Sequence, residues 1–227
     1  MLSKKLIINE IEFSYKEMGK GMPMLILHGF GLDKEAMIGA IEPIFSEMEK
    51  VEIRRIYVDL PGMGKTKCIR PIESSQDVVD AVQDFVEKVI GKEKFFVFGY
   101  SYGGYMAHGL LQQYAERILG MILLCPVIFA EREKRVLPDK KTIIFDEKIL
   151  EKKLSDIERQ EFQEIFILQK YEYWLRYKNE ILPGIELANK ETIKKISENY
   201  DIESIEQDEK QYNIPVLFLL GENDNIV

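Results

Sequence analysis

Residues 94–114, KFFVFGYSYGGYMAHGLLQQY, decide the fold of this chain. The apolar run Lys94–Phe98 predicts a buried strand, and Tyr102–Tyr114 has the pattern of a helix. Between them, residues 99–103 match G-x-S-x-G in the strand-to-helix context that this motif requires. A serine at such a sharp turn takes strained backbone angles, and its neighbours two positions away must be small. The pattern therefore predicts Ser101 as an exposed nucleophile at a helix N-terminus, where free N–H groups favour a developing negative charge.

Outside this stretch, short apolar runs alternate with longer helical patterns, which is typical of βαβ units and a parallel sheet. Residues 127–213 break the alternation because they are long, charged and helical in pattern. We therefore expect a core of residues 1–126 and 214–227, with a helical cap inserted at 127–213. Further strands are expected at Lys5–Asn9, Ile11–Glu17, Met24–Leu27, Ile53–Val58, Leu119–Cys125 and Val216–Leu220, and helices at Asp33–Met48 and Ser75–Ile90.

The composition fits one ordinary globular domain. The chain has 227 residues, of which 46% are hydrophobic and 31% charged, enough for a sizeable core. Its net charge of −8 argues against a nucleic-acid partner, since phosphate binding needs a basic surface. The two cysteines form no disulfide framework, and no metal-type spacing of Cys or His is present. No signal sequence or membrane span is found, so we expect a cytoplasmic protein without membrane association.

Four motifs follow predicted strands. They are HGFG at residues 28–31, DLPGMG at 59–64, GYSYGG at 99–104 and GEND at 221–224. In this order and strand context, they resemble the α/β-hydrolase superfamily, in particular a small serine hydrolase with a helical cap. The resemblance covers nearly the whole chain and implies an α/β fold, with a mostly parallel central sheet flanked by helices.

The resemblance also implies roles for individual residues. The backbone N–H of Tyr102, which follows the nucleophile, and that of Phe30 would hold the oxyanion of a tetrahedral intermediate. Asp224 stands where the family carries the acid that orients the catalytic histidine and stabilises its charged form. The alternative for Asp224 is a solvated turn residue or the cap of a following helix, and for the loop at residues 28–29 it is a simple turn of the chain.

The histidine base of such a triad is not found in this sequence. Of its two histidines, His28 belongs to the oxyanion loop, where a local hydrogen bond is expected. His108 lies roughly 10 Å along the helix from Ser101, too far to take the hydroxyl proton. In the family the base follows the acid after one more strand, but only residues 225–227 follow Asp224. We therefore expect the chain to be C-terminally incomplete and inactive as it stands; the alternative is a natural pseudo-hydrolase.

The predicted function is hydrolysis of a small carboxylic ester, or a related acyl bond, with no cofactor and no metal. Serine at the turn argues against dehalogenase or epoxide hydrolase chemistry, which uses a carboxylate nucleophile. Peptidase, lactonase, C–C hydrolase or perhydrolase chemistry on the same triad remains an alternative, as does a non-catalytic binding protein. Residues 64–66, Gly-Lys-Thr, match the last three residues of the phosphate-binding loop motif, but that motif needs glycine where Asp59 stands.

Two features of the predicted cap have a structural and a functional interpretation. Phe162, Phe166, Tyr173 and Tyr177 fall near one helical face, where packing is favoured over an acyl pocket. Arg132 and Arg135 could meet an anionic substrate, but their charged neighbours favour a solvated surface.

Overall fold

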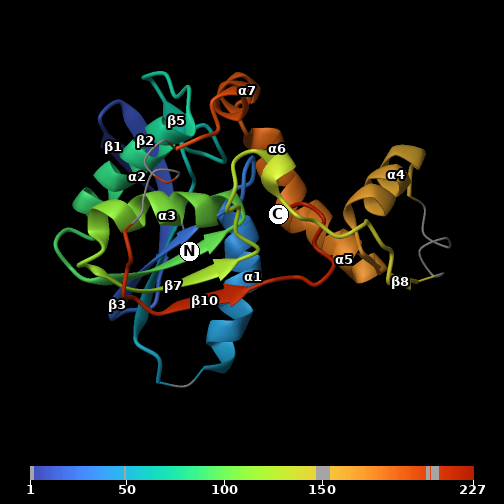
Figure 1. Cartoon of the computed structure of the whole chain (residues 1–227), viewed down its shortest axis with the longest axis horizontal. Helices are drawn as coiled ribbons and strands as arrows, with labels where there is room; N and C mark the ends of the chain where they lie inside the picture. Colours follow the sequence, from blue (N-terminus) through green and yellow to red (C-terminus); the bar gives the residue numbers. More distant parts are fainter. Residues whose placement is uncertain (1–2, 49, 147–153, 203–204, 206–209) are drawn as a thin grey trace.

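A mainly parallel sheet forms the centre of the fold. The computed structural model describes residues 3–48, 50–146, 154–202, 205 and 210–227. The sheet runs in the order β1-β2-β4-β3-β6-β7-β10, with β5 paired to β2 outside this path (Figure 1). Strands β4, β3, β6, β7 and β10 are parallel, whereas β1 and β2 form an antiparallel edge. The strands are β1 Lys4–Ile8, β2 Ile11–Met18, β3 Met22–Leu27, β4 Ile53–Val58, β5 Lys67–Cys68, β6 Phe95–Tyr100, β7 Ile118–Leu124 and β10 Val216–Leu219.

Helices lie on both faces of this sheet, which confirms the predicted α/β fold (Figure 1). Helix α2 starts with a capping box, in which the Ser74 hydroxyl accepts from the Asp77 N–H and the Asp77 carboxylate accepts from the Ser74 N–H. Helix α1 starts after Asp33, whose carboxylate accepts from the N–H groups of Glu35 and Ala36. The three helices that flank the sheet are α1 Lys34–Glu47, α2 Ser75–Val89 and α3 Tyr102–Tyr114.

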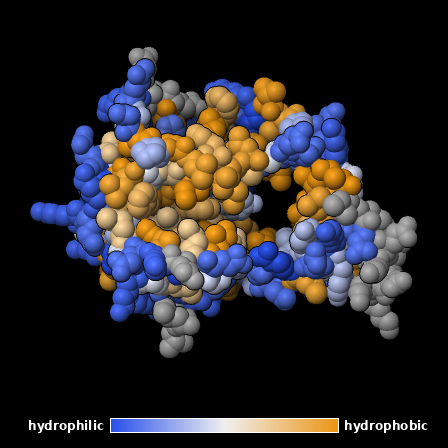
Figure 2. Space-filling model, turned by 90° about the horizontal axis from the view of Figure 1, so that it is seen from below, coloured by the Kyte–Doolittle hydropathy of each residue, from blue (hydrophilic) through white to orange (hydrophobic). Residues whose placement is uncertain are grey.

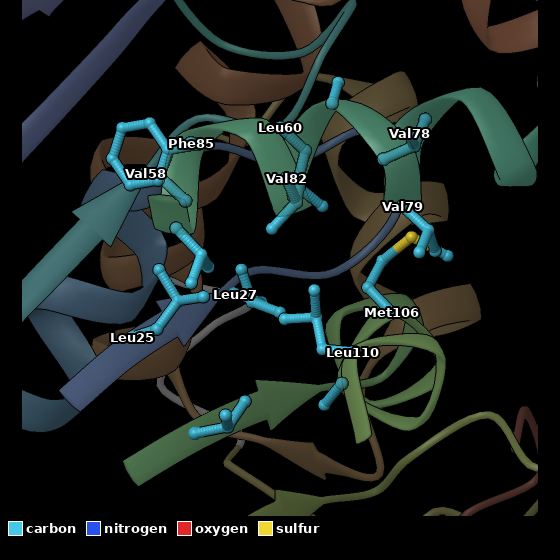
Figure 3. Close-up of a cluster of buried hydrophobic side chains, with 14 of the residues drawn as sticks. Leu25, Leu27, Val58, Leu60, Val78, Val79, Val82, Phe85, Met106 and Leu110 are labelled. Carbon is cyan, nitrogen blue, oxygen red and sulfur yellow. The ribbon is translucent and has the colours of Figure 1, made fainter. Parts of the chain in front are cut away.

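The alternation of side chains along β3 divides the core into two parts. Leu25 and Leu27 point to the side of α2 and α3, and Met24 and Ile26 to the side of α1. Figure 3 shows the first part, where Val82 from α2 packs over the sheet. This packing fixes β3 and β6. The predicted oxyanion loop, residues 28–31, follows the carboxyl end of β3, and the predicted nucleophile turn, residues 99–103, lies at the carboxyl end of β6.

Part of the face that carries α1 is open to solvent. All four residues of β10 are exposed, by 39% for Val216 to 52% for Leu217. A hollow of about 730 Å³ lies between α1 and the strands β7 and β10, with apolar side chains such as Ile44 and Ile122 in its lining. Figure 2, which views the molecule from below, shows apolar side chains gathered on this side. The candidate acid, Asp224, thus follows a strand with exposed side chains.

The segment between β7 and β10 adds no strand to the main sheet among its described residues. It holds the short helix η1, a pair of two-residue strands and a series of helices (Figure 1). Residues 147–153, 203–204 and 206–209 of the predicted cap lie outside the described residues. The elements are η1 Arg132–Lys134, β8 Ile144–Phe145, α4 Asp156–Ile165, β9 Leu168–Gln169, α5 Tyr171–Arg176, a π-helical turn at Tyr177–Ile181, α6 Leu182–Leu187 and α7 Lys190–Glu198.

The aromatic residues of this segment pack together, but not as the helical spacing predicted. Phe162, Phe166 and Tyr177 form a cluster with Trp174, whose ring stacks on that of Tyr177 at 5.3 Å between centroids. Tyr173 was expected on the same face and is not in the cluster; its ring lies 5.6 Å from the Lys170 ammonium instead. The helical spacing is interrupted between α4 and α5, and this break changes which side chains share a face.

The predicted boundaries of the sheet strands and flanking helices differ from the observed ones by one or two residues at most. Strand β5 was not predicted, because two residues are too few to show a periodicity. Within the described residues, no helix is both long enough and apolar enough to cross a membrane.

Candidate active site

Ser101 occupies the turn between β6 and α3, where the motif predicted it. Its φ of +52° lies in the left-handed region, which is costly for any residue with a side chain. The turn is held from both sides. The Ser101 N–H donates to the Leu124 carbonyl at 3.0 Å, and its carbonyl accepts from the N–H groups of Gly104 and Val127 at 2.9 and 3.1 Å. These bonds fix a strained, half-buried serine at the sheet edge.

The glycines around Ser101 leave no room for side chains. A Cβ on Gly99 would lie 2.5 Å from the Gly103 carbonyl oxygen, and a Cβ on Gly103 would collide with the backbone of Leu27. The spacing of the motif is thus a steric requirement of the turn, as predicted. A Cβ on Gly104 would meet Pro126 at 2.6 Å, so this glycine makes room for the loop after β7 rather than for the sheet itself.

The oxyanion loop is anchored through His28. This fully buried imidazole accepts a hydrogen bond from the Leu60 N–H at 2.9 Å, and its Nδ1 lies 2.8 Å from the Gly29 carbonyl. Nδ1 therefore carries the proton and donates it. The Phe30 ring packs edge-on against Tyr102, with 5.1 Å between centroids. The two residues expected to supply the oxyanion N–H groups are therefore neighbours.

Tyr200, which follows α7, joins this pair and was not singled out from the sequence. Its ring contacts those of Phe30, Tyr102 and Tyr105 at centroid distances of 5.6, 5.2 and 5.8 Å. Burial raises the pKa of both Tyr102 and Tyr200, so both phenols stay neutral. Aromatic rings thus line one side of the predicted oxyanion loop, and one of them, Tyr200, comes from the segment between β7 and β10. No local pattern marks Tyr200, because its partners are distant in sequence.

A buried ion pair supports the loop that binds His28. The Lys34 ammonium lies 2.6 Å from the Asp59 carboxylate and donates to the Ser14 hydroxyl at 3.0 Å. The side chains of Lys34 and Asp59 are 1% and 0% exposed. Asp59 also accepts from the backbone N–H groups of Lys34 and Lys65 at 2.8 and 2.9 Å. Asp59 directly precedes Leu60, so this network fixes the position of the N–H that binds His28.

The same network gives residues 64–66, Gly-Lys-Thr, a structural role in the loop after β4. The Lys65 N–H binds the Asp59 carboxylate, and the Thr66 hydroxyl donates to the Asp59 carbonyl at 2.7 Å. Thr66 is buried and also accepts from the Ser14 N–H at 3.0 Å. These groups hold the loop after β4 together, in agreement with a structural rather than a phosphate-binding role. Over the residues described, no cluster of three His, Cys, Asp or Glu side chains suits a metal ion.

Asp224 lies at the same edge of the sheet as Ser101. Tyr100 at the end of β6, Leu124 at the end of β7 and Leu219 at the end of β10 are neighbours across the three strands. Ser101 comes directly after the first of these, and Asp224 follows the last in a turn closed by its N–H. The carboxyl ends of parallel strands thus bring the two residues to one end of the sheet.

Two side chains link Asp224 to the neighbourhood of the nucleophile. Burial, and then a hydrogen bond with the Asp224 carboxylate, raise the pKa of the Cys125 thiol. Burial, followed by the charges of Cys125 and Asp224, raises the pKa of Tyr100, the residue before Ser101. Asp224 is therefore within electrostatic reach of the nucleophile turn.

Arg135 connects residues 221–227, the loop that carries Asp224 and is called the acid loop below, to the loop after β7. Its three guanidinium nitrogens donate to the carbonyls of Phe129, Ala130 and Ile226 at 2.9, 3.1 and 2.9 Å. The Ile226 N–H in turn donates to Asp224 at 2.9 Å. Arg135 is partly exposed, and its guanidinium joins two loops of the chain, a contact that its charged neighbours in the sequence did not predict.

Neither histidine stands where a base would act on Ser101. His28 uses both ring nitrogens in hydrogen bonds to Gly29 and Leu60, and burial lowers its pKa, which keeps the ring neutral. The expected local hydrogen bond of His28 is confirmed. His108 lies half-buried within α3, two turns from the helix start at Tyr102.

Comparison with known proteins identifies relatives of this architecture. Residues 22–227 match the family model described as serine aminopeptidase, S33. The crystal structure of an alpha/beta superfamily hydrolase from Oenococcus oeni PSU-1 is 30% identical and superposes with a TM-score of 0.85. That match covers 99% of this chain and 82% of the other.

Two curated relatives match the chain over about half of its length. A 2-hydroxy-6-oxo-6-(2'-aminophenyl)hexa-2,4-dienoic acid hydrolase from Metapseudomonas resinovorans is 30% identical over 50% of this chain and 39% of its own length. A pimeloyl-[acyl-carrier protein] methyl ester esterase from Legionella pneumophila is 30% identical over 46% of this chain and 38% of its own length. The chain thus spans about two fifths of these relatives.

Proposed function

This chain belongs to the serine aminopeptidase S33 family of the α/β-hydrolase superfamily, and from that premise we propose that it is a serine hydrolase of small carboxylic esters. The observation that carries the proposal is the turn at Ser101. A serine held at a φ of +52° beside an aromatic-walled loop is costly to maintain, and such strain is found mainly at functional sites.

In the proposed reaction, the Ser101 hydroxyl attacks the carbonyl carbon of the ester and gives up its proton to a histidine base. The N–H groups of Phe30 and Tyr102 hold the oxyanion of the tetrahedral intermediate. The same histidine then protonates the leaving alcohol, and water hydrolyses the acyl-enzyme. Asp224 orients the imidazole and stabilises its charged form. Neither His28 nor His108 is placed to act as this base, so the proposed histidine is not among these 227 residues.

A fluorophosphonate probe tests the nucleophile, in a protein that carries these residues together with the histidine. We expect labelling of the wild type and none of Ser101→Ala. Labelling that survives Ser101→Ala would contradict the assignment, and no labelling of either protein would favour a non-catalytic binding protein.

The 227-residue chain itself tests the need for the base. We expect it to hydrolyse p-nitrophenyl acetate no faster than its Ser101→Ala variant. Turnover well above that of the variant would show that a group within these residues replaces the histidine.

A further inference from the structure

A hollow of about 470 Å³ lies beside the oxyanion loop, between this loop and the helices α6 and α7. One wall is formed by Phe30, Gly31 and Leu32, and Gly31 has open space where a side chain would stand. Phe30 is also the proposed oxyanion donor, so the hollow borders the loop that is proposed to hold the ester carbonyl. The opposite wall consists of Ile185, Ala188, Lys190, Ile193, Lys194 and Ser197.

Among the described residues that line this hollow, the charged side chains are both cations. Lys190 and Lys194 lie one helical turn apart on α7, and this described part of the lining holds no carboxylate, in a chain whose net charge is −8. Lys190 is the first residue of α7, at the positive end of the helix dipole, where a cation is unfavourable unless an anion is near. Of the described carboxylates, none lies within 4.0 Å of the Lys190 ammonium.

The second lysine is only loosely paired. Lys194 lies 3.7 Å from Glu198, and both side chains are largely exposed, at 75% and 59%. Such an exposed pair contributes little to the stability of the fold and leaves the Lys194 ammonium group available for another partner. The neighbouring Lys195 differs, because it pairs with Glu73 at 3.0 Å and with Glu191 at 3.4 Å and does not line the hollow.

We infer that this hollow takes the acyl chain of the substrate, and that the substrate is an ester whose acyl chain ends in a carboxylate. The apolar wall covers the methylene groups, and Lys190 and Lys194 meet the terminal charge. This inference rests on the proposed function, since it places the ester carbonyl at Phe30 and Ser101.

Binding of two matched esters to the Ser101→Ala variant tests the inference without hydrolysis. Monomethyl suberate carries one terminal carboxylate, and dimethyl suberate has the same chain without a charge. By calorimetry at low salt, we expect the monomethyl ester to bind about five- to tenfold more tightly. The preference should shrink at 0.5 M salt, because exposed charges are screened.

Charge reversal identifies the residues responsible. Lys190→Glu combined with Lys194→Glu should abolish the preference, whereas the matched control Lys195→Glu should keep it. An unchanged urea midpoint establishes that the variants fold. Equal affinity for the two esters, or a preference that survives the double variant, would overturn the inference.

Hydrolysis separates this inference from the proposed function. Equal turnover of both esters, in a protein that carries the histidine, would leave the function standing and overturn the selectivity. Selective binding without labelling of Ser101 would do the reverse.

Discussion

On the nucleophile side of the candidate site, Ser101 and Phe30 follow strands from the centre of the sheet, and buried groups hold their loops. On the acid side, Asp224 follows β10, whose four residues are all exposed. The nucleophile turn is fixed by steric fit and by backbone hydrogen bonds. The acid loop depends on a few polar contacts, namely one hydrogen bond from Arg135 to the Ile226 carbonyl and those that Asp224 accepts from the Ile226 and Val227 N–H groups. The two sides of this candidate site thus differ in how they are held, and we expect the acid side to open locally more easily.

The largest effect is expected on the nucleophile side, from Lys34→Met. This change leaves the Asp59 carboxylate buried without its cation, and breaking a buried pair in this way costs about 3–5 kcal/mol. The free energy of unfolding in urea measures the loss. The matched control is Lys16→Met, which breaks a partly exposed pair with Glu35 and should cost less than about 1 kcal/mol. Equal losses for the two variants would contradict the role given to the buried network.

The next effect concerns His28 and depends on pH. Burial lowers the pKa of His28, with Asp59 and Lys34 as the charged groups that face it. Below the ordinary pKa of about 6.5, the unfolded chain binds a proton that the folded chain resists, so stability is lost as the pH falls. At pH 5.5, one unit below that pKa, this loss is at most about 1.4 kcal/mol relative to pH 7.5, the limit for a ring that stays neutral in the folded chain.

Urea unfolding at the two pH values, for wild type and His28→Gln, measures this term. The wild type should lose more stability than the variant between pH 7.5 and 5.5, by at most about 1.4 kcal/mol. The variant His108→Gln removes the other histidine and shows whether the effect belongs to His28. If wild type and His28→Gln lose the same amount, His28 is not held neutral by the fold.

The contrast between the two sides also explains what the sequence could predict. The nucleophile turn was predictable because its steric requirement involves glycines within a few positions of Ser101. The position of Asp224 after β10, at the same end of the sheet as Ser101, was predictable because the carboxyl ends of parallel strands share one edge. These features arise from local pattern and from the rules of the fold.

Other residues could not be placed because their partners lie far away in the sequence. A lysine at the start of a helix is normally exposed. Lys34 is buried instead because it binds Asp59, which follows β4, and Ser14 in β2. Arg135 stands among charged residues, yet it binds carbonyls of two loops that meet only in the folded chain. Tyr200 reaches the oxyanion loop in the same way.

The smallest effect is expected on the acid side, from Arg135→Met. The change removes three hydrogen bonds to the carbonyls of the two loops, but the side chain is partly exposed, so water replaces much of what is lost. We expect local opening of residues 221–227 to become easier by about 1 kcal/mol, with little change in global stability. Hydrogen exchange measures this as a roughly fivefold faster exchange of the Ile226 and Val227 amides.

Peptides from the same exchange experiment compare the two sides directly. Residues 99–105 around Ser101 should exchange as slowly as in the wild type, because their hydrogen bonds do not involve Arg135. The control Arg132→Met removes an exposed arginine of the short helix η1, which directly precedes Arg135, and should leave both regions unchanged. If Arg135→Met also loosens residues 99–105, the two sides are one cooperative unit, and the acid loop is held by the nucleophile turn rather than by Arg135.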